Sequence, residues 1–269
     1  MNSALRWPLE SVWEAVAPSL PGFTVEVLPE VDSTNAELMR RARTGVLDPV
    51  LLIVERQTQG RGRLGRQWHS MSRLGSSQTM ALTFSLGLRL APQEWSGLSL
   101  AVGLAIAQSL HPEIRLKWPN DLWWRDRKLA GILIETGNWG EASASRYVVI
   151  GVGINIVAPD AGGLSTPPAG LNEMLHAVDA PAALALIAAP LVHAIQTFEA
   201  HGFAPFQTAF NTRDALAGVP VGLSDGVNGV AQGVDASGAL LLHTAQGVKR
   251  VTSSEVSVRP QSAPVVTAG

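Results

Sequence analysis

One long polar segment constrains the fold of this chain more than any other feature. It extends from Glu55 to about Gln78, is rich in glycine and arginine, and lies between two apolar runs. The run before it, Val50–Val54, predicts a buried strand, and Thr79–Leu86 predicts the next one. A connection of this length inside a compact domain is typically functional or mobile. Any fold for the chain must therefore accommodate a chemically rich loop between two neighbouring strands.

The pattern on either side of this loop predicts an α+β domain with a mixed sheet. Further strands are expected at 23–28, 114–117 and 147–156, and a hairpin is expected to pair 122–124 with 128–135. A helix should begin at 32–35, where Thr34 and Glu37 have capping-box spacing. Other helices are expected at 95–110, 182–200 and 203–216, with an irregular Pro-, Gly- and Ala-rich connection over 158–180.

The composition changes beyond Gly218. Short β-rich runs are separated by Asp225-Gly226, Asn228-Gly229 and Ser237-Gly238, which are hairpin turn signals. This spacing predicts a small β-barrel-like module. We expect a large domain over 1–217, the β module over 218–262 and a frayed tail over 263–269.

Charge and cysteine content exclude several classes of protein. The chain has 20 Lys+Arg against 22 Asp+Glu, so it has no bulk positive charge with which to bind phosphate backbones non-specifically. It has no cysteine, which excludes disulfides, iron–sulfur clusters and thiol catalysis. The N-terminus lacks the pattern of a signal peptide, and the most apolar runs, 98–110 and 182–195, are too short to span a bilayer. We therefore expect a cytoplasmic protein without a membrane partner.

The loop itself contains a formal G-x-G-x-x-G at Gly60, Gly62 and Gly65. A dinucleotide site would need a helix directly afterwards, and residues 68–73 show no helical periodicity. The three glycines alternate with arginines at 61, 63 and 66, which lets a flexible backbone approach an anion that guanidinium groups neutralise. An exposed basic loop without a ligand is the alternative.

Two further segments place charge at strand ends. In Lys117–Asp121, the proline ends a strand and turns Asn120 and Asp121 outward, so that Asp121 could hold Mg²⁺ on nucleotide phosphates. Ordinary turn chemistry is the alternative. Lys128 is one of only three lysines, and Gly131 on the same strand would allow a ligand to approach closely. A snorkelling lysine at a strand edge explains Lys128 equally well.

The remaining polar and aromatic residues are less specific. Gly151–Asn155 is another glycine-interrupted strand, for which a tight strand crossing is the alternative reading. Six of the eight tryptophans fall between Trp68 and Trp139, and some of them are expected to wall an apolar pocket while most pack in the core. The histidines have no metal-ligand spacing, and no serine lies in a nucleophile elbow.

Together and in this order, five segments closely resemble the bacterial biotin protein ligases. They are Ser33–Asn35, Gly60–Arg66, Lys117–Asp121, Lys128–Glu135 and Gly151–Asn155. The end of the chain, Ser257–Arg259, resembles that family's C-terminal SH3-like module. The resemblance implies a mixed-sheet domain of the class II synthetase-like biotin/lipoate ligase type. It also implies synthesis of biotinyl-5′-AMP from biotin and MgATP, followed by transfer of biotin to a lysine of a biotin carboxyl carrier domain on acetyl-CoA carboxylase or a related carboxylase.

The resemblance also assigns roles to individual residues. The biotin side would be formed by Ser33, Thr34, Asn35, Gln57, Arg61, Gly62, Arg63, Trp68, Lys128 and Gly131. ATP and the adenylate would be bound by Arg63, Arg66, Asn120, Asp121, Lys128, Asn155 and Arg259. Lys128 and Arg63 would be catalytic, and Asp121 would be the Mg²⁺ ligand. The physical logic agrees, because a carboxylate and a triphosphate must meet and cations reduce their repulsion.

The sequence departs from the family in two places. Many relatives begin with a DNA-binding winged helix, but only about thirty residues precede Ser33, so we expect a monofunctional ligase without a DNA partner. Residues 72–79 differ from the family's usual approach to the next strand. A weak or ligand-linked homodimer is compatible with the sequence.

Two other functions compete with biotin ligation. Lipoate and octanoyl ligases share the fold, but octanoyltransferases need a cysteine nucleophile, and the Arg–Gly loop with Lys117–Asp121 favours biotin. A biotin sensor without catalysis is the second competitor, and the presence of both Lys128 and Asp121 argues against it.

Overall fold

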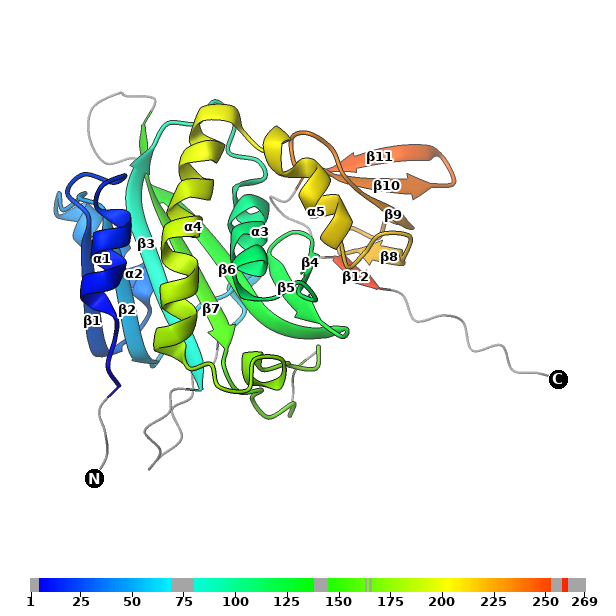
Figure 1. The fold of residues 1–269 in the computed structure, drawn as a ribbon. Helices are drawn as coiled ribbons and strands as arrows, with labels where there is room; N and C mark the ends of the chain where they lie inside the picture. Colours follow the sequence, from blue (N-terminus) through cyan, green and yellow to red (C-terminus); the bar gives the residue numbers. More distant parts are fainter. Residues whose placement is uncertain are drawn as a thin grey trace.

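A seven-stranded mixed sheet forms the centre of the molecule (Figure 1). The computed structural model describes residues 5–68, 80–137, 145–162, 164, 166–252 and 258–260. The strand order is β1-β2-β3-β7-β6-β5-β4, in which β1 and β2 are parallel and the other neighbours are antiparallel. The strands are β1 (Thr24–Val31), β2 (Val50–Gln57), β3 (Ala81–Leu90), β4 (Arg115–Lys117), β5 (Asp121–Trp124), β6 (Arg127–Gly137) and β7 (Arg146–Asn155).

Helices cover both faces of this sheet. They are α1 (Leu9–Val16), α2 (Thr34–Arg43), α3 (Leu98–Leu110), α4 (Ala180–His201) and α5 (Gln207–Arg213), with short 3₁₀ turns η1 (Arg63–Gly65), η2 (Leu171–Glu173) and η3 (Ala204–Phe206). Successive residues of β3 point to opposite faces of the sheet. The even-numbered residues 82–90 lie in the main core on one face, while Gly87 faces Leu38 of α2 on the other. With both faces covered, the central strands β3 and β7 are buried almost throughout.

The predicted elements are present, with four corrections. The side chain that caps α2 is that of Ser33, which accepts from the Ala36 amide at 3.4 Å, and not that of Thr34. The single helix expected at 203–216 is a 3₁₀ turn followed by the short helix α5. Helix α1 was not predicted. Helix α4 begins at Ala180 and spans 22 residues, longer than the apolar run recognised in the sequence.

Helix α4 is therefore long and apolar enough to cross a membrane by length and composition alone. Core helices often pass the same test, and 56% of its most apolar window is buried. Its buried residues join the main core, and the helix packs against α3 and β3. This packing accounts for its apolar composition without a bilayer.

The C-terminal part forms a second, smaller antiparallel sheet. Its strands are β8 (Pro220–Leu223), β9 (Asn228–Val234), β10 (Leu240–Thr244), β11 (Gly247–Val251) and β12 (Val258–Pro260). Their order is β11-β10-β9-β8-β12, so β11 and β12 are the two edges and the described strands do not close into a barrel. The α+β class with a small C-terminal β module is confirmed. The boundary at 217/218 remains a prediction, and the tail 263–269 lies outside the described residues.

Candidate active site

A single cavity of about 1010 Å³ brings the predicted site residues together. Its lining includes Ser33, Thr34, Asn35, Gln57, Arg61, Gly62, Arg63, Arg66, Trp68, Asn120, Asp121, Lys128, Gly131, Asn155 and Arg259. These residues come from α2, from the loop after β2, from strands β2, β5, β6 and β7 of the large sheet, and from strand β12 of the C-terminal sheet. The segment 72–79, which departs from the family pattern, lies outside the described residues.

A bulge in strand β6 turns Lys128 toward this cavity. Asp121 pairs with Gly131 and Leu122 with Ala130, but Trp123 pairs with Lys128, so one residue, Leu129, is extra in β6. Regular alternation would place Lys128 on the same face as Ala130, which is buried in the core. The extra residue moves it to the other face, where its Nζ lies 2.7 Å from Asp121 Oδ1. Lys128 is therefore a paired cation in the cavity wall and not a snorkelling surface lysine.

Two asparagines hold the backbone on either side of this lysine. Asn120 Nδ2 donates to the Ile132 carbonyl at 2.8 Å, and the Ile132 amide donates back to the Asn120 carbonyl at 3.0 Å. Asn155 Nδ2 donates to the carbonyls of Lys128 at 3.3 Å and of Ala169 at 3.1 Å. The asparagines thus fix the strand end and the connection that passes beside it.

The opposite end of the cavity is polar but contains fewer charges. Gln57 Oε1 accepts from the Thr34 amide at 2.8 Å, and the Thr34 hydroxyl lies 2.7 Å from the hydroxyl of buried Ser85. Ser85 also donates to Asn35 Oδ1 at 2.6 Å, and Asn35 Nδ2 donates to Glu135 Oε2 at 2.8 Å. Sequence reasoning missed Ser85 and Glu135; a serine within an apolar strand was the available signal. Its members that line the cavity, Thr34, Asn35 and Gln57, present uncharged donors and acceptors, which suits a neutral polar ring.

The glycines of β7 explain how side chains reach the sheet surface. A Cβ on Gly153 would lie 2.3 Å from Cε2 of Trp68, and one on Gly151 would lie 2.1 Å from Asn35 Oδ1. Trp68 therefore packs directly on the Gly153 backbone, and Asn35 on that of Gly151. Trp68 and Trp123 wall the cavity, whereas Trp118 and Trp124 lie in the core and Trp139 lies outside the described residues. The glycines permit a close approach of side chains, which is a different cause from the strand crossing considered above.

Buried polar atoms without a partner gather at this cavity. Among the described residues, four buried side-chain atoms lack a hydrogen bond, and three of them belong to the cavity-lining residues Trp68, Thr83 and Trp123. Buried polar groups are nearly always satisfied in native proteins. A polar ligand or water in the cavity would supply the missing partners.

Residues 60–68, which we call the Arg–Gly loop, form a small hairpin that lines the cavity. Arg61 and Gln67 pair in an antiparallel bridge, and the Gly62 amide donates to the Arg66 carbonyl at 2.7 Å. Leu64 at the tip has a φ of 56°, and its side chain is 56% exposed. Burial lowers the pKa of the Arg63 guanidinium, which the charge of Asp121 partly offsets. The segment is a short hairpin and not the strand-to-helix turn of a dinucleotide fold.

A further cation, Lys117, lines the cavity, although no role was predicted for it. Lys117 Nζ lies 5.2 Å from the centroid of the Trp123 ring, and Lys117 pairs with Asp121 across the β4–β5 hairpin. Burial lowers the Lys117 pKa, while Asp121 raises it and the charge of Lys128 lowers it. Its position in the Lys117–Asp121 segment was the signal that could have identified it.

No described group of three or more His, Asp or Glu side chains could form a metal cage. Asp121 lies beside Lys128 and Lys117, and one carboxylate in that position fits a metal that arrives on a polyanionic nucleotide, since Mg²⁺ keeps most of its ligands as phosphate and water.

Comparison with known proteins decides the family. Residues 27–155 match the model of the biotin/lipoate A/B protein ligase family, and 219–259 match the biotin protein ligase C-terminal domain. The bifunctional ligase/repressor BirA of Escherichia coli is 35% identical over 255 residues, covering 89% of this chain and 75% of that protein. The biotin–[acetyl-CoA-carboxylase] ligase of Paracoccus denitrificans is 34% identical over 240 residues, covering 86% and 98%. The chain belongs to the biotin protein ligase family.

A solved structure agrees with this assignment. The biotin protein ligase of Aquifex aeolicus in complex with biotin and ATP is 27% identical, covers 88% of this chain and 99% of its own, and superposes with a TM-score of 0.72. As a biotin protein ligase, this chain is an enzyme that attaches biotin to protein with ATP as the energy source. The predicted fold and reaction are confirmed, while the roles of individual residues remain predictions.

Proposed function

We propose that the cavity binds biotin at its uncharged end and MgATP at its cationic end, and joins them as biotinyl-5′-AMP. The observation that carries this proposal is the way in which charged and uncharged side chains are distributed around the cavity. Polar, uncharged side chains from α2 and β2 line one part of the cavity, while Lys117, Lys128, Arg63 and Arg66 lie near Asp121 in another. A carboxylate held between these ends would meet the α-phosphate where the cations are concentrated.

In the first step, a biotin carboxylate oxygen attacks the α-phosphorus and pyrophosphate leaves. Lys128 would contact both the carboxylate and the phosphate, and Arg63 would stabilise the charge that develops on the phosphoryl oxygens. Mg²⁺, bound with the nucleotide near Asp121, would neutralise phosphate charge. Asn120, Asn155, Arg66 and Arg259 would position the nucleotide.

In the second step, we propose that the amine of an acceptor lysine attacks the acyl carbon of the adenylate. The amide bond forms, AMP leaves and the amine proton passes to solvent. The acceptor would be the biotin carboxyl carrier domain of acetyl-CoA carboxylase or a related carboxylase, because the Paracoccus relative bears that name. Closure of the Arg–Gly loop would exclude water from the mixed anhydride until the acceptor arrives.

Biotin-dependent exchange of radiolabelled pyrophosphate into ATP tests the first step. We expect exchange with biotin and none with lipoate in a parallel tube. Exchange with lipoate alone would assign the chain to lipoate ligation, and tight biotin binding without exchange would indicate a sensor. Transfer of labelled biotin to a purified carrier domain tests the second step.

We further propose that the enzyme acts in the cytoplasm as a monomer or a weak, ligand-linked dimer, without DNA. Sedimentation with and without biotin and ATP would detect ligand-linked association.

A further inference from the structure

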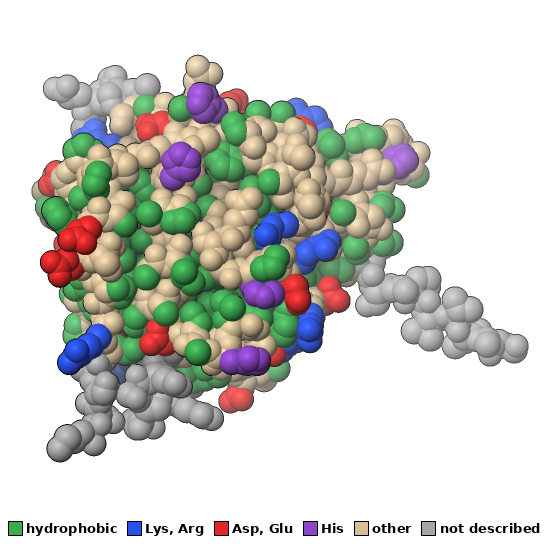
Figure 2. Space-filling model, viewed as in Figure 1, with side chains coloured by type: hydrophobic (Ala, Val, Ile, Leu, Met, Phe, Trp, Pro, Cys, Tyr) green, Lys and Arg blue, Asp and Glu red, His purple; other side chains and the backbone are tan. Residues whose placement is uncertain are grey.

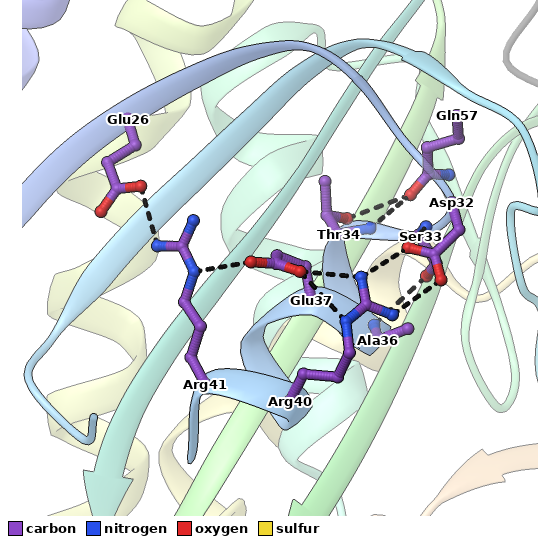
Figure 3. Close-up of polar contacts among 9 residues, drawn as sticks. All are labelled: Glu26, Asp32, Ser33, Thr34, Ala36, Glu37, Arg40, Arg41 and Gln57. Atoms are coloured by element: carbon purple, nitrogen blue, oxygen red, sulfur yellow. Dashed lines mark hydrogen bonds and ion pairs between the residues drawn. The ribbon is translucent and has the colours of Figure 1, made fainter. Parts of the chain in front are cut away.

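Five charged side chains form a continuous chain along the exposed side of α2 (Figure 3). Arg41 bonds to Glu26 at 2.8 Å and to Glu37 at 2.9 Å, and Glu37 bonds in turn to Arg40 at 2.7 Å. Arg40 then binds Asp32 with both of its terminal nitrogens, at 2.7 and 2.8 Å. The chain of charges thus ends on the residue that immediately precedes Ser33.

The Asp32 carboxylate is held on both oxygens. Besides the bonds from Arg40, Oδ1 accepts from the Ser33 amide at 2.7 Å. The hydrogen bond from Arg40 is the main reason that the pKa of Asp32 falls to about 2, so the carboxylate stays charged at neutral pH. Paired donors of this kind fix geometry as well as charge, because a guanidinium and a carboxylate meet in one plane.

The backbone at Val31 and Asp32 also accepts hydrogen bonds from the two residues that precede Gly60, the first residue of the Arg–Gly loop. The Thr58 amide donates to the Val31 carbonyl at 2.9 Å, and the Gln59 amide donates to the Asp32 carbonyl at 2.8 Å. Asp32 therefore links two segments that line the cavity, one starting at Ser33 and the other at Arg61. The charge of Arg61 also reaches Asp32 and lowers its pKa.

Global stability does not require the Arg40 contact. The side chains of Arg40 and Asp32 are 47% and 33% exposed, and ion pairs exposed to this degree contribute little to folding. Helix α2 packs on the sheet through Leu38 and Ala42. These two residues form a buried apolar cluster with residues of β2 and β7. What Arg40 constrains is the local position of Asp32.

We propose that Arg40 is a positioning residue for the biotin end of the site. By holding Asp32, it fixes Ser33, Thr34 and Asn35 together with the first residues of the Arg–Gly loop. This inference rests on the proposed function, in which these residues contact biotin. Arg40 itself is not among the residues that line the cavity.

Arg41 provides a matched control. It is the next residue of the same helix and belongs to the same chain of charges, but it binds Glu26 and Glu37 and not Asp32. We would compare Arg40→Gln with Arg41→Gln by calorimetric titration of biotin, by steady-state adenylation and by thermal unfolding. Arg40→Lys tests rescue, because lysine restores the charge without the paired geometry.

For Arg40→Gln we expect the biotin Kd and the biotin KM to rise on the order of tenfold, with kcat and the ATP KM unchanged. Arg41→Gln should stay within about twofold of the wild type in biotin affinity, because Arg41 makes no bond to Asp32. Arg40→Lys should fall between the wild type and Arg40→Gln. Both glutamine variants should lower the unfolding midpoint by similar small amounts.

Equal biotin affinities in Arg40→Gln and Arg41→Gln, at any unfolding midpoint, would overturn the inference. The calorimetric readout separates this result from failure of the proposed function. A wild type that binds biotin but forms no adenylate would refute the proposed function, while the Kd comparison would still decide the role of Arg40. A wild type that binds no biotin would refute both.

Discussion

At the scale of single residues, the site depends on close approaches that only glycine allows. Gly151 and Gly153 of β7 lie under Asn35 and Trp68, and a Cβ at either position would overlap these side chains. The sequence identified the glycine-interrupted strand, but the approaching side chains lie more than eighty residues away in the chain. The contact is therefore visible only after folding.

Gly153→Ala should displace Trp68 and weaken biotin binding by roughly 10-fold to 100-fold, as expected when a group in a site moves by about 1 Å. Calorimetric titration measures this change. Gly162→Ala is the control for the added methyl group, because Gly162 lines the same cavity but a Cβ there meets no protein atom within 4 Å. Unchanged biotin affinity in Gly153→Ala would show that the Trp68 position does not matter.

Arg63→Gly should release or hydrolyse the adenylate roughly 10-fold to 100-fold faster, because a cation that neutralises the phosphoryl group is lost. Retention of biotinyl-AMP on the enzyme after gel filtration measures the effect. Arg56→Gln, at an arginine paired with Glu30 outside the cavity lining, is the control. Retention of bound adenylate equal to that of the wild type would contradict the role given to Arg63.

At the scale of elements, tertiary hydrogen bonds override local capping patterns. Thr34 and Glu37 have capping-box spacing, but the Thr34 hydroxyl turns toward Ser85 and Gln57, and Glu37 pairs with two arginines. Ser33 takes over the cap of α2. The cap of α4 follows the local rule, because Asp179 Oδ1 accepts from the Ala182 amide at 2.8 Å.

Asp179→Ala should therefore lower the free energy of unfolding by about 1 kcal/mol, the usual cost of losing an N-cap. Urea denaturation measures this loss, and Asp179→Ser should recover most of it because serine also caps helices. Since α4 is remote from the cavity lining, the biotin and ATP KM values should not change. A stability equal to that of the wild type would show that the cap contributes nothing.

At the scale of the whole molecule, positive charge is not concentrated on the face viewed in Figure 2. That face carries scattered Lys and Arg side chains among acidic and apolar ones, as a formal charge of −2 leads one to expect.

The two sheets of the molecule are packed together through a shared core. Trp118 Nε1 donates to the Gly238 carbonyl at 3.1 Å, and Val221, Leu240 and Val258 of the small sheet join the main core cluster. This packing holds Arg259 of β12 at the cavity.

Asp214 lies buried where α5 leads toward the small sheet, and it should make stability depend on pH. Burial raises its pKa from 3.8 to about 6, although the Leu216 amide donates to its carboxylate. The folded state thus keeps the proton more tightly, so this stabilisation is present below pH 4 and is lost as the pH rises through about 6. Asp214→Asn retains an acceptor for the amide and removes the buried charge.

We expect Asp214→Asn to be more stable than the wild type at pH 7.5 by on the order of 2 kcal/mol, with a much smaller difference near pH 4. Urea denaturation at both pH values measures the two differences. A constant difference across this range would contradict the raised pKa.

The sequence by itself determined most strands and helices in their order along the chain, the absence of cysteine chemistry and the segments that carry cations and glycines, because these follow from local patterns. The tertiary structure decided which side chains meet. It joined Asn35 to Ser85 and Glu135, and through the bulge at Leu129 it turned Lys128 from the core face to the cavity face beside Asp121. A register shift of one residue reverses the direction of a side chain, and the packing of strands distant in the chain sets that register.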